Sequence, residues 1–240
     1  MAIQHSIASL GLLFGFLLTI HAQGFLNLGF ESNPILVGPD PNIFGSDYSI
    51  PHWTVYYNGT SQNGVLINNY ILDYTTAALF VGSSAIDGDQ SVFLAASSYE
   101  APVGGVSTES ISQSGVIPIS ANSIQFELGS IDAFGNGINT SLPQNNFFVT
   151  VNGQIVPLQI ISNGGSFLTL GGNVSRWAGQ TAQLSIGVTV PFNSANPGEI
   201  LFSGVIDSVA FSSNPVPEPS AFALAMLDVG AALLILHRKI

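Results

Sequence analysis

The chain has 240 residues, no cysteine, 14 acidic and three basic residues, and a formal net charge of −11. Without cysteine, a disulfide framework, a thiol nucleophile and a cysteine metal site are excluded. The negative balance disfavours nucleic acid and anionic lipid as partners. Only 7% of residues are charged, which suits neutral polar partners such as glycans, and solubility alone is the alternative explanation.

The N-terminal segment is apolar from Ile7 to Ile20 and ends in a small residue, Ala22. This pattern predicts a secretory signal peptide over residues 1–22, with cleavage after Ala22. A positively charged start is missing, so a start codon assigned slightly late is the alternative explanation. Export of the remaining chain is the expected consequence.

Residues 23–211 show no helical periodicity, and short runs of β-branched and aromatic residues recur between Gly, Asn and Pro. A length of about 190 residues fits one all-β domain. Many short strands with Gly-rich turns predict a single antiparallel β-sandwich, a jelly roll. The predicted strands are 25–30, 53–57, 65–68, 77–81, 91–96, 107–113, 123–128, 147–151, 154–161, 166–170, 181–190 and 201–211.

Three local features refine this domain. Asn152-Gly153 lies between two strand-like runs, and this pair favours a tight hairpin turn because both residues tolerate positive φ. Residues 174–178 predict one helical turn between strands. Residues 212–215 are predicted to be a linker.

The last 25 residues combine three features in a fixed order. Val216-Pro217-Glu218-Pro219-Ser220 is an extended segment, because its prolines fix φ and lack a backbone donor. Residues 221–236 form an apolar run that as a helix spans roughly 24 Å, short of a hydrocarbon core. Arg238 and Lys239 follow in the tail 237–240 and favour a cytoplasmic end.

This order resembles a PEP-CTERM sorting signal over residues 216–240. The resemblance implies an exported protein of a Gram-negative bacterium that an exosortase recognises and cleaves near the motif. The protein would be held in the membrane by the C-terminal helix until it is processed, and would then belong to the cell envelope or the extracellular matrix, in association with exopolysaccharide. An ordinary C-terminal anchor helix is the alternative.

A second resemblance covers residues 25–211. Five segments follow the order of the strands in galactose-binding-like, carbohydrate-binding jelly rolls, and His52 stands where that family usually has glycine. The family implies carbohydrate or cell-surface binding and often one structural calcium ion. This resemblance implies that Glu31 and Asp207 are the calcium ligands. The alternative is that these two acids are solvated or cap turns. Asp87 and Asp89 are predicted to be turn residues. The five segments are 26–31, 50–55, 87–94, 178–184 and 202–209.

Catalytic chemistry has little support. His52 is the single histidine between the two terminal segments, no lysine lies there, and no Gly-x-Ser-x-Gly sequence occurs. We therefore expect a protein that is not an enzyme and that binds or scaffolds polysaccharide. The alternative that stays open is a glycan-acting hydrolase with an acidic carboxylate pair. Tyr56 and Tyr57 are the candidate ligand-binding residues, because neighbours in a strand point to opposite faces and one of them should be exposed.

Overall fold

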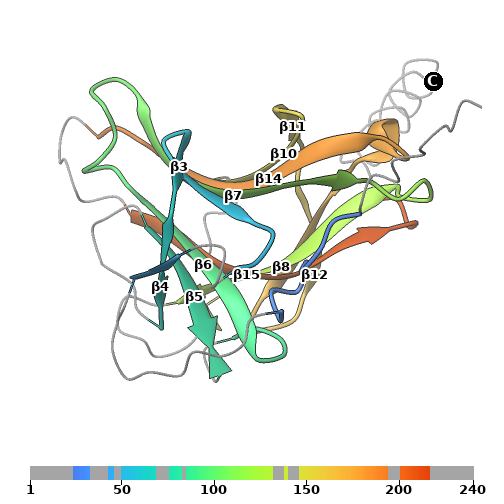
Figure 1. Ribbon diagram of the computed structural model, residues 1–240, viewed down its shortest axis with the longest axis horizontal. Helices are drawn as coiled ribbons and strands as arrows, with labels where there is room; N and C mark the ends of the chain where they lie inside the picture. Colours follow the sequence, from blue (N-terminus) through green and yellow to red (C-terminus); the bar gives the residue numbers. More distant parts are fainter. Residues whose placement is uncertain are drawn as a thin grey trace, which may run out of the picture.

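A computed structural model of the chain describes residues 24–32, 43–45, 50–68, 76–82, 85–131, 138–139, 146–193 and 201–216. These residues form two β-sheets that face each other as two layers (Figure 1). The all-β, two-sheet sandwich predicted from the sequence is confirmed. The described residues include no helix that is long and apolar enough to cross a membrane. The predicted signal peptide and membrane segment lie outside the described residues.

The larger sheet has nine strands. Its order is β1 (Ile43–Gly45), β4 (Gly64–Ile67), β5 (Thr76–Val81), β6 (Gln90–Ser97), β15 (Leu201–Ser212), β8 (Ser123–Ile131), β13 (Leu168–Asn173) and β12 (Gln159–Asn163), with β9 (Ile138–Asn139) paired to β8. The pairing of β4 with β5 is parallel.

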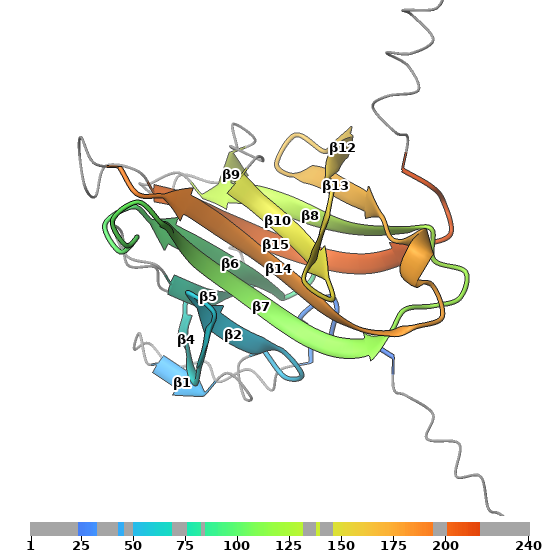
Figure 2. The same cartoon turned by 90° about the horizontal axis from the view of Figure 1, so that it is seen from above.

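The smaller sheet has six strands. Their order is β11 (Gln154–Val156), β10 (Phe147–Val151), β14 (Thr181–Pro191), β7 (Val106–Val116), β2 (Thr54–Tyr57) and β3 (Thr60–Gln62). The long strands β6, β7, β8 and β10 alternate between the two sheets, and so do β13, β14 and β15. Seen from above, this sheet lies over the nine-stranded one (Figure 2).

The main core lies between the sheets and follows from strand alternation. Val55, Ile111, Ile186, Val149 and Val156 are register partners across five strands of the six-stranded sheet. All five are at most 1% exposed and belong to one apolar cluster. Burying apolar surface stabilises the fold by roughly 25 cal/mol per Å². Each strand therefore turns one set of alternate residues inward and the other set outward.

The first described segment closes the sandwich at one end, and it is not the strand predicted at 25–30. Asn27 and Phe30 have φ of 49° and 59°, which breaks an extended chain. The segment is held by side chains instead: the Gln113 amide bonds Leu26 N and O at 2.5 and 2.9 Å, and Trp53 Nε1 donates to Asn27 O at 3.0 Å. Trp53 is 1% exposed and belongs to the core cluster.

Three other sequence predictions have different outcomes. The hairpin turn is confirmed, with φ of 51° at Asn152 and 73° at Gly153. A helical turn is confirmed at Ser175–Trp177. The single strand predicted over 154–161 is wrong, because β11 ends at Val156 and β12 begins at Gln159 in the other sheet. Pro157 separates them, and its missing N–H cannot join a ladder.

The segment after β15 is held against the sandwich. Asn122 Nδ2 donates to Ser213 O at 2.6 Å, and Ser123 Oγ donates to Asn214 O at 2.7 Å. Val216 is 5% exposed. Residues 213–216, which include the predicted linker's end and the first residue of the sorting motif, therefore have fixed positions.

Candidate functional site

One row of residues crosses the outer face of the six-stranded sheet and carries two aromatic rings. Tyr56 on β2 is the register partner of Ser110 on β7, Ser110 is that of Gly187 on β14, and Gly187 is that of Phe148 on β10. Their neighbour Val55 belongs to the inner core, so these residues point away from it. Tyr56 and Phe148 are both half-buried.

The middle of the row is shaped by Gly187. An ideal Cβ at this position would lie 2.5 Å from Phe148 Cζ and 2.6 Å from Ser110 Cβ. Only a residue without a side chain lets the Phe148 ring lie over β14. The two aromatic residues are three strand spacings apart, which is roughly 14 Å. The row is therefore a shallow strip with a ring at each end.

The rest of this outer face is lined by hydroxyl and amide groups. Where the structure describes residues that point outward from β2, β7, β10 and β14, none carries a charge. Several of the groups bond one another: Thr108 Oγ1 lies 3.4 Å from Thr189 Oγ1, and Gln183 Nε2 donates to Ser112 Oγ at 3.3 Å. The other polar members of this face are Thr54, Ser114, Thr150, Thr181 and Ser185, and Val106, Val116 and Pro191 lie at the strand ends.

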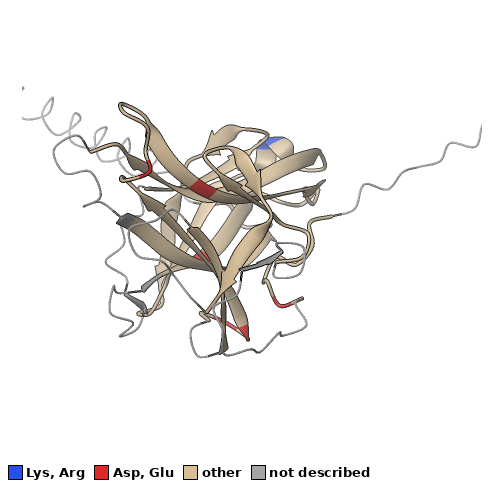
Figure 3. Cartoon of the chain, turned by 60° about the vertical axis from the view of Figure 1, so that its left-hand side comes forward, with Lys and Arg blue, Asp and Glu red and all other residues tan. Residues whose placement is uncertain are grey.

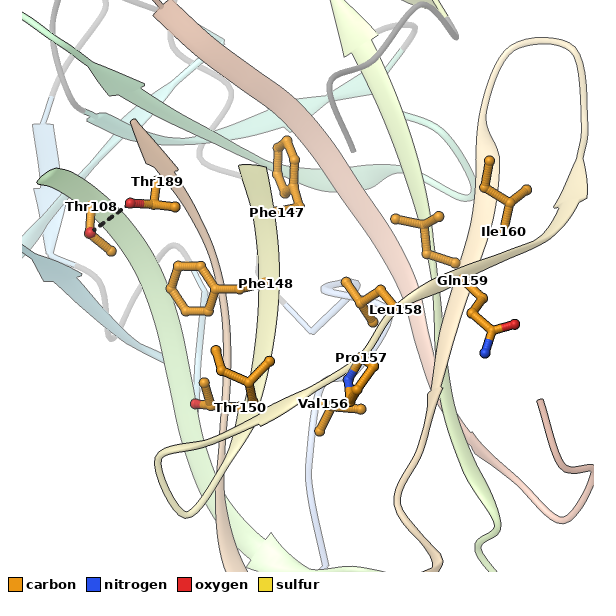
Figure 4. A pocket seen from close by; sticks show the side chains of 12 residues that line it. Thr108, Phe147, Phe148, Thr150, Val156, Pro157, Leu158, Gln159, Ile160 and Thr189 are labelled. Atoms are coloured by element: carbon orange, nitrogen blue, oxygen red, sulfur yellow. Dashed lines mark hydrogen bonds between the residues drawn. The ribbon is translucent and has the colours of Figure 1, made fainter. Parts of the chain in front are cut away.

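A groove with a volume of about 830 Å³ opens beside Phe148 (Figure 4). The ring points toward Thr108 and Thr189, while Pro157 and the chain that crosses to the other sheet form the opposite wall. Ile155 and Ile160 contribute an apolar rim and are 62% and 48% exposed. The groove thus combines an aromatic ring, aliphatic side chains and hydroxyl groups, and no charged residue lines it.

Tyr57 points to the opposite side from Tyr56, into the sandwich. It is the register partner of Glu109, which is 2% exposed and whose Oε2 atom has no hydrogen-bond partner. Burial, with a smaller contribution from Glu100, raises the pKa of Glu109 to about 9. Burial and the two glutamates also raise the pKa of Tyr57. Glu109 is therefore protonated at neutral pH, and Tyr57 does not share a surface with Tyr56.

Glu31 and Asp207 lie at the same turn, which precedes β6. Glu31 Oε1 accepts from the backbone N–H groups of Asp89 and Gln90 at 2.9 and 3.0 Å. Asp207 Oδ2 accepts from Asp87 N at 3.2 Å and from Ser91 Oγ at 2.5 Å. The two acids predicted to share calcium therefore both cap one turn.

The electrostatics of this turn are unfavourable to ionised acids. Burial raises the pKa of Asp207 to about 6, hydrogen bonds from Ser91, Ser208 and Asp87 oppose that shift, and Glu31 adds to it. Burial, followed by Asp87 and Asp207, raises the pKa of Glu127. In the part of the chain that the structure describes, no three acidic or histidine side chains are grouped to hold a metal ion. Glu31 and Asp207 are engaged by N–H and hydroxyl groups of the turn, and calcium binding stays a prediction.

Two further sets of predicted residues can be located. Residues 217–240, which hold most of the sorting motif and the basic tail, lie outside the described residues. His52 is exposed with a φ of 73°, a conformation that glycine adopts without strain.

Sequence reasoning missed Phe148 and the hydroxyl rows around it. The alternation Phe147-Phe148-Val149-Thr150-Val151 already places Phe148 and Thr150 on one face, opposite three apolar residues. That pattern was the available indication. It does not reveal that Tyr56 lies in the same row, because that depends on the register of β7 and β14 between them.

Comparison with known proteins gives little. No family model matches the chain, and no curated protein matches it. Among solved structures, a match is found with the crystal structure of a β-glucosidase from Kluyveromyces marxianus in complex with glucose. The TM-score is 0.24 at 13% identity, over 46% of this chain and 11% of that one. The chain thus aligns with about a tenth of that enzyme, and at this score the likeness supports no conclusion about fold or function.

Proposed function

We propose that this protein is an exported, non-catalytic component of the cell envelope or extracellular matrix that binds polysaccharide. The observation that carries the proposal is the row from Tyr56 through Ser110 and Gly187 to Phe148, set in an uncharged face of hydroxyl and amide groups. Sugar rings present CH faces that stack on aromatic rings and hydroxyl groups that exchange hydrogen bonds with side chains. A strip with a ring at each end fits a polymer better than a monosaccharide.

The proposal is tested by retention of the protein on insoluble exopolysaccharide. Tyr56→Ala and Phe148→Ala should each weaken retention, and the double variant should abolish it, because each ring is one stacking contact. Tyr99→Ala is the matched control, since Tyr99 is 63% exposed but lies in the loop between β6 and β7 and is not a member of the row. Unchanged retention of the double variant, or an equal loss with Tyr99→Ala, would refute this site.

Weak individual contacts agree with a scaffolding role. An exposed ring and a few hydroxyl groups give modest affinity, and many copies on one matrix would supply the avidity. We expect retention on polymer, little binding of free monosaccharide and no turnover of either. Release of reducing ends by the purified protein would overturn the non-catalytic assignment.

We further propose the PEP-CTERM assignment for residues 216–240 and the jelly-roll topology for the domain. The alternation of long strands between the sheets supports the jelly roll. Exosortase would be the processing partner, with membrane attachment through residues 221–236 until cleavage. Pro217→Ala with Glu218→Gln should leave a tailed, membrane-held form. Detection of Arg238 and Lys239 in the mature native protein by mass spectrometry would contradict processing.

A structural calcium ion at Glu31 and Asp207 remains a separate proposal. A bound ion would stabilise the folded state by about 2.7 kcal/mol at a hundredfold excess over its dissociation constant. Thermal melting with calcium and with chelator should then differ by several degrees. Identical melting temperatures would leave these acids as turn caps only.

The alternative function is a glycan-acting hydrolase. The candidate carboxyl pair is Glu100 and Glu109. In addition to burial, the charge of Glu100 contributes to the raised pKa of Glu109, which is protonated. A raised pKa is what a general acid needs. Glu109 is nevertheless 2% exposed, and neither glutamate lines the groove beside Phe148. The reducing-end assay above distinguishes the two functions.

A further inference from the structure

A second, smaller hollow lies on the other side of Pro157. Its volume is about 360 Å³, and it lies between the end of β11 and the helical turn Ser175–Trp177. Ile155 and Pro157 line both this hollow and the groove beside Phe148. The two are therefore neighbours along one track over the edge of the sandwich. The remaining lining residues are Asn173, Ser175, Arg176 and Trp177.

Arg176 is the only basic residue between positions 24 and 215. Its guanidinium carbon lies 3.7 Å from the centroid of the Trp177 ring. Trp177 is 6% exposed and belongs to the core cluster, so the platform under the guanidinium is rigid. Arg176 itself is exposed. Stacking of this kind orients the plane of the guanidinium and leaves its N–H edge for a ligand.

The surroundings of Arg176 leave its charge unneutralised. Among the residues that the structure describes, no acidic side chain forms an ion pair with it. In Figure 3 the blue part of the cartoon, which marks Lys and Arg, lies apart from the red parts, which mark Asp and Glu.

Asn173 adds a second donor of fixed orientation. Its Oδ1 atom accepts from Ser175 N at 3.0 Å and from Ser175 Oγ at 2.8 Å. The backbone N–H can only donate, so the amide oxygen must face Ser175 and the NH₂ group must face the other way. Ser175 Oγ uses its hydrogen on Asn173, so the side-chain donors that remain for a ligand are the Arg176 guanidinium and the Asn173 NH₂ group. Both are donors, and their complement is an acceptor that carries negative charge.

We propose that this hollow binds the carboxylate of an acidic sugar unit in a polysaccharide chain that lies along the groove beside Phe148. The proposal rests on the proposed function and adds a charge preference to the same track. The planar guanidinium matches the two oxygens of a carboxylate. Ile155 and Pro157 supply the apolar contact for the sugar ring between the two hollows. The protein would then prefer acidic to neutral polysaccharide, although the chain carries a net charge of −11.

The test compares polygalacturonate with its carboxyl-reduced form, which keeps the polymer backbone and loses the charge. The full-length chain in mild detergent is run on both by affinity electrophoresis. The wild-type protein should bind polygalacturonate about tenfold more tightly, as expected for hydrogen bonds to a charged group. Arg176→Gln should remove that difference and leave binding to the reduced polymer unchanged. Arg176→Lys keeps the positive charge but loses the paired N–H donors and the planar stacking of the guanidinium. It should keep part of the preference for polygalacturonate.

Three outcomes would overturn the inference. Equal binding of both polymers by the wild-type protein would contradict the charge preference but leave the proposed function intact. Equal loss of binding to both polymers in Arg176→Gln would mean that the arginine only supports Trp177. Failure of the wild-type protein to bind either polymer, and to be retained on exopolysaccharide, would remove the proposed function together with the inference.

Discussion

The outer faces of the two sheets differ, and the difference indicates where a ligand can bind. On the part of the nine-stranded sheet formed by β4, β5, β6 and β15, the apolar residues that point away from the main core form a second cluster and are at most 7% exposed. On the six-stranded sheet, the outward positions hold mostly serine, threonine and glutamine, with two half-buried aromatic rings and the exposed aliphatic residues Val106 and Ile155. The cluster consists of Leu66, Ala78, Phe80, Phe93, Ala95 and Val205, with Ile86 packed against it.

The sequences of the strands explain this difference. Strand β6 reads Gln-Ser-Val-Phe-Leu-Ala-Ala-Ser, and all eight residues are buried. Strand β7 contains Ser-Thr-Glu-Ser-Ile-Ser-Gln-Ser, in which polar residues predominate. A strand buried on both faces reads as a continuous apolar run, whereas a strand with one wet face alternates. The β4, β5, β6 and β15 part of one sheet is therefore buried on both faces, whereas the other sheet has one face free for recognition.

The largest expected effect comes from removing one phenylalanine from each outer face. Phe93 is 3% exposed and its ring centroid lies 5.1 Å from that of Phe80. Phe93→Ala should lower the free energy of unfolding by about 3–5 kcal/mol. Phe148→Ala should cost about 1 kcal/mol, because this ring is only half-buried. Urea unfolding measures both; equal losses would mean that the two faces do not differ in the way described.

A second prediction sharpens the contrast between neighbours on β7, since Glu109 points inward and Ser110 outward. The unfolded chain releases the Glu109 proton near pH 4.5, and the folded protein holds it to about pH 9. The contribution of Glu109 to the free energy of unfolding should therefore be most favourable below pH 4.5 and should decrease as the pH rises toward 9. Glu109→Gln stays neutral, so it should be more stable than wild type at pH 7 by up to about 3 kcal/mol.

The matched control for this prediction is Glu100→Gln, because Glu100 is only a secondary cause of the shift at Glu109. It should change stability much less than Glu109→Gln. Urea unfolding of the three proteins at pH 4.5, 7 and 9 gives the comparison. If the free energy of unfolding changes with pH in the same way for wild type and Glu109→Gln, Glu109 is not held in its neutral form.

The smallest expected effect concerns Gly187, which separates the two ends of the aromatic row. A Cβ at this position would meet Phe148 Cζ at 2.5 Å, so Gly187→Ala should displace the ring at a cost of about 1–2 kcal/mol. Retention on polysaccharide should fall as much as in Phe148→Ala. Ser185→Ala, two residues away on the same face, is the control and should leave both stability and retention nearly unchanged. Normal retention of Gly187→Ala would mean that the ring position is unimportant.

Local patterns in the sequence predicted much of the fold. Strand 147–151 and the Asn152-Gly153 turn follow from alternation and from residues that accept positive φ. The segment 25–30 could not be predicted in the same way, because its hydrogen bonds come from Gln113 and Trp53, which are distant in sequence. Pro157 did mark the break between β11 and β12, and the pattern of the flanking residues obscured it.

The sequence predicts only half of the candidate site. Tyr56 was named from its strand, but its partner Phe148 is brought into the same row by the register of β7 with β14 and of β14 with β10. Register between strands far apart in sequence is set by the packing of the whole sandwich. No local pattern contains it.

The most direct test of the central claim is an NMR titration of the isotope-labelled protein with a soluble oligosaccharide from the exopolysaccharide. The account predicts that chemical shifts change at Tyr56, Ser110, Gly187 and Phe148, with little change in the apolar cluster around Phe93. Changes centred on Glu100 and Glu109, or on the turn held by Glu31 and Asp207, with none in the row, would contradict the account.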